Sequence, residues 1–110
     1  MHVIIYKLLA YLYDCMKHGK NVDNAMLDRT SAIFGGIPES YRCAIVSQVS
    51  DRGYVKGLSV FYSDNQPQVV IAEPSITLDG VEYMFENSMM QRALRWLQDM
   101  KSALPFIKPA

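Results

Sequence analysis

The 110-residue sequence is poor in cysteine and in charge and has no long apolar run, and each shortage excludes a class of protein. Cys15 and Cys43 have no CxxC spacing and only two histidines to join them, so we expect reduced core thiols rather than a zinc site. Lys7, Asp14 and Lys17 interrupt the apolar N-terminus, so no stretch is long enough for a membrane-spanning helix. The same segment lacks the basic start and the cleavage site of a signal peptide, and we expect a cytoplasmic protein.

An excess of positive charge is also lacking. Eleven Lys and Arg balance eleven Asp and Glu, which removes overall basicity as an argument for nucleic-acid binding. Residues 61–87 carry five acidic side chains and no basic one, whereas residues 1–60 carry seven basic and five acidic ones. The apolar fraction of 50% still predicts a packed globule, and the length fits one domain over residues 1–110.

Motifs of catalysis are absent as well. The chain has no GxSxG, no HExxH, no P-loop and no glycine fingerprint at a strand-to-helix turn. Asp79, Glu82 and Glu86 follow one another at helical spacing, but acidic side chains near the start of a helix are explained by its dipole. We therefore expect no enzyme, no cofactor, no bound metal and no small-molecule substrate.

Apolar periodicity predicts two helices before the Gly-Gly pair in the first third of the chain. Apolar residues at helical spacing cover residues 2–18, and Gly19 can end this helix. A shorter helix follows, with Asn21 or Asp23 as its cap and apolar residues up to Phe34. With the next helix it forms a predicted helix-turn-helix pair.

A third helix is predicted to start at Pro38, because the first helical turn tolerates a missing N–H, and to end at Gly53. Its apolar seam consists of Tyr41, Ala44, Ile45 and Val49. The polar or small side chains opposite the seam or near its edge are Ser40, Arg42, Cys43, Ser47 and Asp51. This second group is the solvent face that a partner can contact.

After the third helix the pattern changes to that of strands. β-branched and aromatic residues concentrate over residues 54–62 and 69–72, and the polar segment between them holds turn formers and a proline. These runs predict a hairpin whose second strand ends at Pro74. Thr77 can cap a following helix, in which Gly80 lets the backbone pack closely.

The last predicted helix spans about residues 88–104 and carries an apolar stripe. At about 1.5 Å per residue it is long for the terminal helix of a small domain. The stripe can dock on the first helix, or it can form the seam of a homodimer, and the sequence leaves both open. The candidate residues for the dimer interface are Met89, Ala93, Trp96, Leu97 and Met100.

The order of these elements is that of an α+β winged helix-turn-helix domain, with three helices, a β-hairpin wing and two C-terminal helices. Three segments carry a closer resemblance: RGYVKG at residues 52–57, FYSDNQP at 61–67 and ITLDGVEYM at 76–84. Over residues 37–88 the chain resembles the YjcQ family, which comprises small winged-helix proteins of Gram-positive bacteria and their phages. The resemblance implies a regulatory or phage-related role and supplies no catalytic residue.

Two functions remain open. A winged-helix dimer can bind double-stranded DNA with its third helix in the major groove, where Arg42 suits guanine and Gln48 suits adenine. The alternative is a protein-interaction or dimerisation module without DNA binding, which the acidic wing region favours because phosphates repel carboxylates. The candidate DNA-binding residues are Ser40, Arg42, Cys43, Ser47, Gln48 and Lys56.

Overall fold

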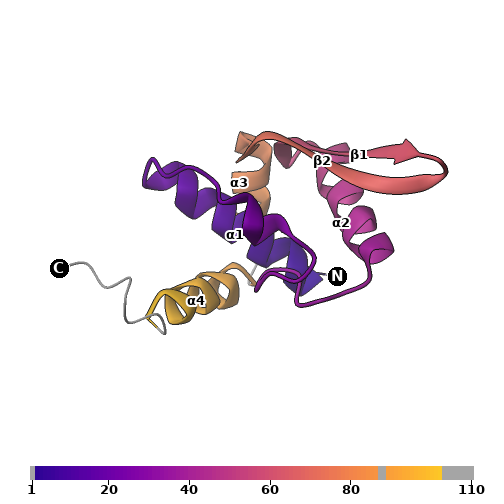
Figure 1. Ribbon diagram of the computed structural model, residues 1–110. Helices are drawn as coiled ribbons and strands as arrows, with labels where there is room; N and C mark the ends of the chain where they lie inside the picture. Colours follow the sequence, from indigo (N-terminus) through magenta and orange to yellow (C-terminus); the bar gives the residue numbers. More distant parts are fainter. Residues whose placement is uncertain (1, 87–88, 103–110) are drawn as a thin grey trace.

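The computed structural model describes residues 2–86 and 89–102, which form an α+β domain with a two-stranded antiparallel hairpin (Figure 1). In chain order the elements are α1 (His2–Lys17), a 3-10 turn η1 (Asn24–Leu27), α2 (Glu39–Asp51), β1 (Val55–Ser63), β2 (Gln66–Ile76), α3 (Leu78–Phe85) and α4 (Met89–Ser102). The expected ends of the last helix, at 88 and 104, lie outside the described residues. None of the helices described here has the length and apolarity that crossing a bilayer requires. The arrangement is compatible with the winged helix expected from the sequence.

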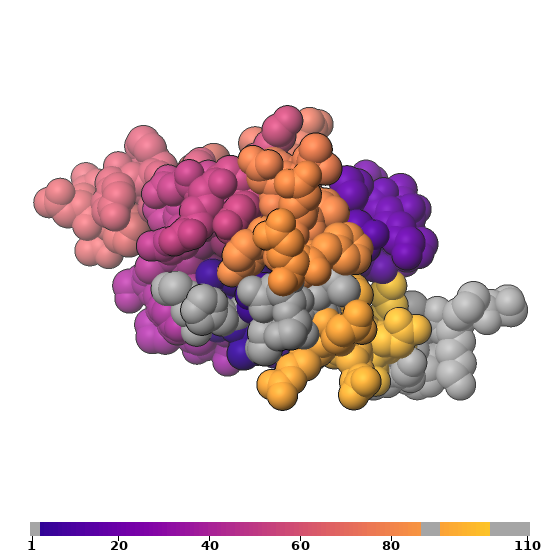
Figure 2. All heavy atoms as spheres, turned by 180° about the vertical axis from the view of Figure 1, so that it is seen from behind, coloured from indigo at the N-terminus to yellow at the C-terminus, as the bar shows by residue number. Residues whose placement is uncertain are grey.

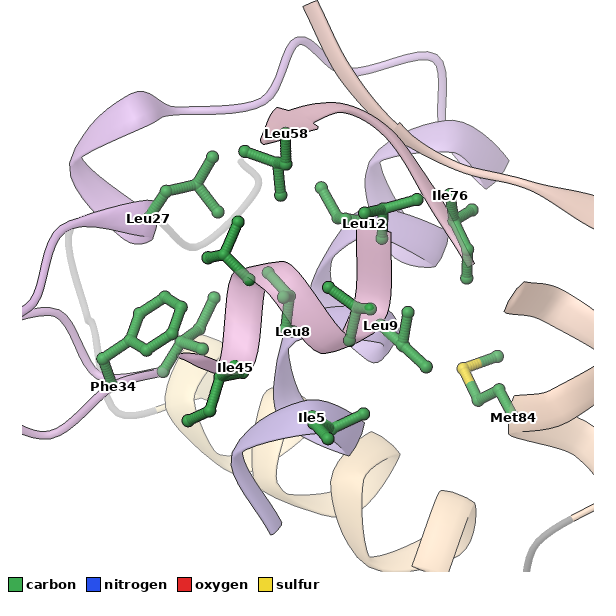
Figure 3. Close-up of a cluster of buried hydrophobic side chains, with 14 residues drawn as sticks. Ile5, Leu8, Leu9, Leu12, Leu27, Phe34, Ile45, Leu58, Ile76 and Met84 are labelled. Carbon is green, nitrogen blue, oxygen red and sulfur yellow. The ribbon is translucent and has the colours of Figure 1, made fainter. Parts of the chain in front are cut away.

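Helix α1 runs through the middle of the domain because it is apolar on more than one side. Leu8 and Leu9 are fully buried and join a core to which η1, α2, both strands and α3 contribute (Figure 3). Away from this core, Tyr6 and Ala10 pack with Ala93 of α4. The sequence predicted one apolar face on α1. The second buried side of α1, which α4 covers, was not predicted.

The predicted second helix is wrong. Between α1 and α2 the chain forms only η1 and a series of turns. Asp23 is the cap, because its side chain accepts the N–H of Ala25 at 3.0 Å. The helix stops where the carboxylate of Asp28 bonds the N–H and the hydroxyl of Thr30, since this local turn competes with helical bonding. Phe34 is still buried, so the segment supplies the core without being a helix.

Helix α2 forms where it was predicted, but a different side of it is buried. Its buried residues are Arg42, Cys43, Ile45, Val46 and Val49. Ala44 is exposed, so the predicted seam was wrong there. Positions 42, 45, 46 and 49 obey the helical spacing rule as well as positions 41, 45 and 49 do. Only contacts with the rest of the domain decide between the two faces.

The hairpin has a tighter turn than predicted. Asp64 and Asn65 have φ of 52° and 63° and form a two-residue turn, so the strands begin directly on either side of it. Short polar side chains tolerate this left-handed conformation. Pro67 lies inside β2, opposite Tyr62. At that pair the N–H of β2 points away from β1, so proline there removes no ladder bond.

The sequence predicts that the second strand ends at Pro74, and this prediction is wrong. Strand β2 continues to Ile76 through a bulge that leaves Ala72, Glu73 and Pro74 opposite Gly57. Gly57 has φ of 77°, and a Cβ atom there would collide with the carbonyl oxygens of Ala72 and Glu73. Glycine at this position is therefore a requirement of the bulge.

The start of α3 confirms two predictions. The hydroxyl of Thr77 accepts the N–H of Gly80 at 3.0 Å, and it also donates to the carbonyl of Gly53. Gly80 lies directly against the carbonyl of Tyr54 and the side chain of Ile76. The cap thus fixes α3 to the segment that joins α2 to β1.

Candidate functional site

Two surfaces correspond to the binding regions expected from the sequence. One is the exposed side of α2. The other is the hairpin arm, which we define as residues 58–71. In the ribbon and space-filling views this arm projects beyond the rest of the molecule (Figure 1, Figure 2). The two surfaces differ in charge and in polarity, and these differences decide what each can bind.

Arg42, one of the predicted DNA contacts, does not lie on the exposed side of α2, because this side chain is used inside the domain. Arg42 is 8% exposed. Its Nε donates to the carbonyl of Leu27 at 2.8 Å, and its Nη1 donates to the two carboxylate oxygens of Glu39 at 3.1 and 2.8 Å. Its guanidinium carbon lies 5.7 Å from the centre of the Phe34 ring. Arg42 therefore ties η1 to α2.

Cys43, another predicted DNA contact, is also buried, at 3% exposed, and does not lie on the exposed side of α2. Its buried position results from the side on which α2 packs. Cys15 is buried too, and both cysteines are free thiols, which confirms the expectation drawn from their spacing. Burial raises the pKa of both thiols.

These thiols give a direct test of the packing. Because the thiolate is the reactive form, we expect DTNB to modify the native protein at least about tenfold more slowly than the urea-unfolded protein. Single-cysteine variants, Cys15→Ala and Cys43→Ala, assign the two rates. Rapid modification of Cys43 in the native protein would contradict its burial.

The exposed side of α2 keeps the other predicted residues but offers little positive charge. Ser40 and Gln48 are exposed and Ser47 is half-buried. The N-terminal half of α2, which would enter a DNA groove, has the carboxylate of Glu39 as its exposed charge. Arg29, in the segment before α2, turns inward and donates to backbone carbonyls at residues 36 and 37, at 3.4 Å in each case.

Positive charge appears only beyond the C-terminal end of α2. Arg52 and Lys56 are exposed there, and Asp51 is exposed beside them. Lys56, the last of the predicted DNA contacts, is thus accessible but lies at the base of the hairpin. Lys7, another basic residue of the first half of the chain, lies over the Trp96 ring at 5.1 Å, on the α4 side of the domain.

The hairpin arm has an aromatic surface without cations. Phe61 and Tyr62 are 58% and 68% exposed, and Val70 is exposed as well. Asp64 is the one charged residue between positions 57 and 72, and the chain has no Lys or Arg from position 57 to 91. Phe61 and Tyr62 are not among the site residues predicted from the sequence. The sequence feature that could have identified them is an aromatic pair close to a polar turn, at the end of a segment, Gly57 to Ser63, that carries no charge.

The predicted dimer stripe of α4 is partly used inside the chain. Ala93 and Leu97 are buried, and Ala93 packs with Tyr6 and Ala10 of α1, so neither can form a seam between two chains. An ion pair of 2.8 Å between Lys101 and Asp14 also joins α4 to α1. Intramolecular docking, the alternative that the sequence left open, therefore occupies this part of the stripe. The side chain of Met89 lies outside the described part of the structure.

The rest of the stripe borders a surface hollow. Trp96 and Met100 are half-buried and line a depression of about 470 Å³ together with Arg92, Arg95 and Asp99. Among the residues that the structure describes, those that line this depression all come from α4. In residues 2–86 and 89–102, no three His, Cys, Asp or Glu side chains gather where they could hold a metal ion.

Comparisons with known proteins address the family. A family model described as "YjcQ protein" matches residues 6–103. The comparison with curated proteins and the comparison with solved structures gave no match. The family match covers nearly the whole chain, including most of α1 and all of α4, which the resemblance of residues 37–88 did not reach. The chain therefore belongs to the YjcQ family.

Proposed function

We propose that this protein is a winged helix-turn-helix domain that acts by binding another protein through its hairpin arm, without catalysing a reaction. The order of α1, η1, α2, hairpin and α3 supports the winged-helix assignment. In this assignment η1 occupies the position of the second helix of the motif, and the hairpin is the wing. The Thr77 cap, which bonds both Gly53 and Gly80, holds the element after the wing against the end of α2.

The observation that carries the choice of partner is the exposed aromatic pair on an arm without cations. A wing that lies along a duplex supplies Lys or Arg to the phosphates, because counterion release provides much of the affinity. Phe61 and Tyr62 instead offer apolar area of the kind that is concentrated at the centre of protein interfaces. Asp64 at the tip adds a charge that repels phosphate.

Site-specific photo-crosslinking in cells tests this proposal. A benzophenone amino acid replaces Phe61 in one variant and Gln91, which is exposed on α4, in a control variant. We expect light to produce a discrete protein adduct from position 61 and none from position 91. A nucleic-acid adduct from position 61, or equal protein adducts from both positions, would contradict a protein-binding hairpin arm.

DNA binding by α2 is the second candidate function. It is favoured by the exposed Ser40 and Gln48 and by the two cations, Arg52 and Lys56, beyond the end of the helix. The measurement is fluorescence anisotropy of a labelled random duplex at low salt. Our proposal predicts no binding at tens of micromolar protein, whereas a salt slope corresponding to about three phosphates, lowered by Lys56→Ala, would favour DNA.

A further inference from the structure

We propose that a second copy of this chain binds the hairpin arm, with β1 pairing antiparallel to β1 of the other copy across a two-fold axis at Val60. The inference rests on the proposed function in so far as both place the partner on the hairpin arm. It adds the identity of the partner, the strand that makes the contact and the register.

The outer edge of β1 has backbone hydrogen-bonding groups that no strand uses within the described residues. Strand β1 pairs with β2, and within the described residues it has no other strand neighbour. The Ser63–Gln66 pair flanks the two-residue turn and exchanges ladder bonds, so every second pair along the arm does the same. Leu58, Val60 and Tyr62 therefore direct their N–H and C=O groups away from β2. These groups are a template for another strand.

Of the two edges of the hairpin, β1 is the less protected against pairing with another strand. Natural sheets guard exposed edges with proline, charge or a bulge. Strand β2 has Pro67 and Pro74, and Glu73 bends it with φ of 52°. Strand β1 has no proline, and it carries no charge from Gly57 to Ser63. The bulge also bends β1, at Gly57 with φ of 77°, so the two edges differ within residues 58–71. There an added strand can pair along β1 but meets the missing donor of Pro67 along β2.

The sequence of β1 is complementary to itself when two copies are related by a two-fold axis at Val60. A two-fold axis at Val60 pairs each residue with the one equally far beyond the axis, so Leu58 lies opposite Tyr62 of the other copy. Lys56 and Asp64 are equally far from the axis along the chain, so each end of the paired segment brings Lys56 of one copy toward Asp64 of the other. These are the residues that bound the uncharged segment, and their charges are opposite. Two copies thus match apolar residue to apolar residue and cation to anion at both ends, as an isologous interface requires.

The pairing leaves one face of the arm free. Ser59 pairs with Val70 and Phe61 pairs with Gln68, so these four side chains share a face. Joining β1 to β1 places Phe61 of each copy beside Ser59 of the other and makes one four-stranded sheet. The exposed Phe61 and Val70 side chains of both copies then form a continuous surface.

Sedimentation equilibrium from about 1 to about 500 µM chain tests the inference with a matched pair of variants. Val60 and Val69 lie opposite each other in the hairpin and are both half-buried. Val60→Pro removes an outward N–H from β1, whereas Val69→Pro removes the equivalent N–H from β2. We expect wild type and Val69→Pro to dimerise, and Val60→Pro to associate at least about tenfold more weakly. A wild type that stays monomeric throughout, or equal effects of the two prolines, would overturn the inference.

A charge variant keeps the test decisive if Val60→Pro does not fold. Lys56 is exposed, so Lys56→Glu leaves the core intact, and it places like charges at both ends of the pairing. We expect it to weaken dimerisation most at low salt, because salt screens exposed charges. An unchanged dissociation constant at low salt would overturn the register. A dimer that is lost in Trp96→Ala and kept in Lys56→Glu would instead assign the contact to α4.

The crosslinking experiment separates this inference from the proposed function. An adduct from position 61 at twice the 12.5 kDa of one chain supports pairing between copies. Adducts of other masses, from a chain that sediments as a monomer, overturn the second-copy inference and leave a protein-binding hairpin arm in place. A β1-dependent dimer that also binds duplex DNA supports the inference and contradicts the proposed function.

Discussion

Replacing Arg42 by alanine is expected to lower the free energy of unfolding by about 3 kcal/mol. The change leaves the carbonyl of Leu27 without its donor and empties the space that the Arg42 side chain fills beside Phe34. Leu27 is the last residue of η1, so its carbonyl has no following helical turn to bond it. Urea unfolding followed by circular dichroism measures the effect.

Two control variants separate the parts of this contact. Arg42→Met retains apolar packing and loses the hydrogen bonds, so its effect is expected to be smaller than that of Arg42→Ala. Glu39→Ala removes a partner whose side chain is 47% exposed, and it is expected to cost less than about 1 kcal/mol. If Arg42→Ala left stability unchanged and reduced DNA binding, Arg42 would be a DNA-reading residue after all.

Replacing Gly80 by alanine is expected to destabilise the protein by about 3 kcal/mol, although alanine favours a helix. Helix propensity alone predicts a gain of about 1 kcal/mol from this change. The added Cβ atom, however, would collide with the carbonyl oxygen of Tyr54 and lie 2.8 Å from Cγ1 of Ile76. Because the first of these is a backbone atom, α3 must move away from β1 to relieve the collision.

A neighbouring substitution provides the comparison. Glu82 is exposed on the same helix, and Glu82→Ala is expected to change stability by no more than about 0.5 kcal/mol. Thermal or urea unfolding of the two variants distinguishes a collision from a general effect on α3. If Gly80→Ala were as stable as wild type or more so, the close contact between α3 and the residue before β1 would be refuted.

The candidate site could be predicted from the sequence only in part. Ser40, Gln48 and Lys56 are accessible as predicted, because a polar residue opposite apolar neighbours needs no partner inside the fold. Arg42 could not be placed, since it contacts Leu27 and Phe34, which belong to a segment that was predicted to be helical. Cys43 is buried with it on the same side of α2. Phe61 and Tyr62 are exposed because the turn is only two residues long. The paired strands therefore continue up to the turn and extend beyond the core, with both residues on the extended part.

Features that depend on neighbours along the chain could be predicted from the sequence. Helices α1, α2, α3 and α4, the hairpin, the Thr77 cap and the close packing of Gly80 all follow from periodicity, capping and turn chemistry over a few residues. The family assignment likewise came from short motifs and is confirmed over residues 6–103.

Tertiary structure alone decided which side of each helix is buried. Two faces of α2 satisfy the same spacing rule, and the bond from Arg42 to the carbonyl of Leu27 selects one of them. The docking of α4 on α1 similarly uses Ala93 and Leu97 inside the chain. The physical reason is that a buried polar or apolar group is stable only where a distant segment supplies its partner, and sequence spacing carries no information about that partner.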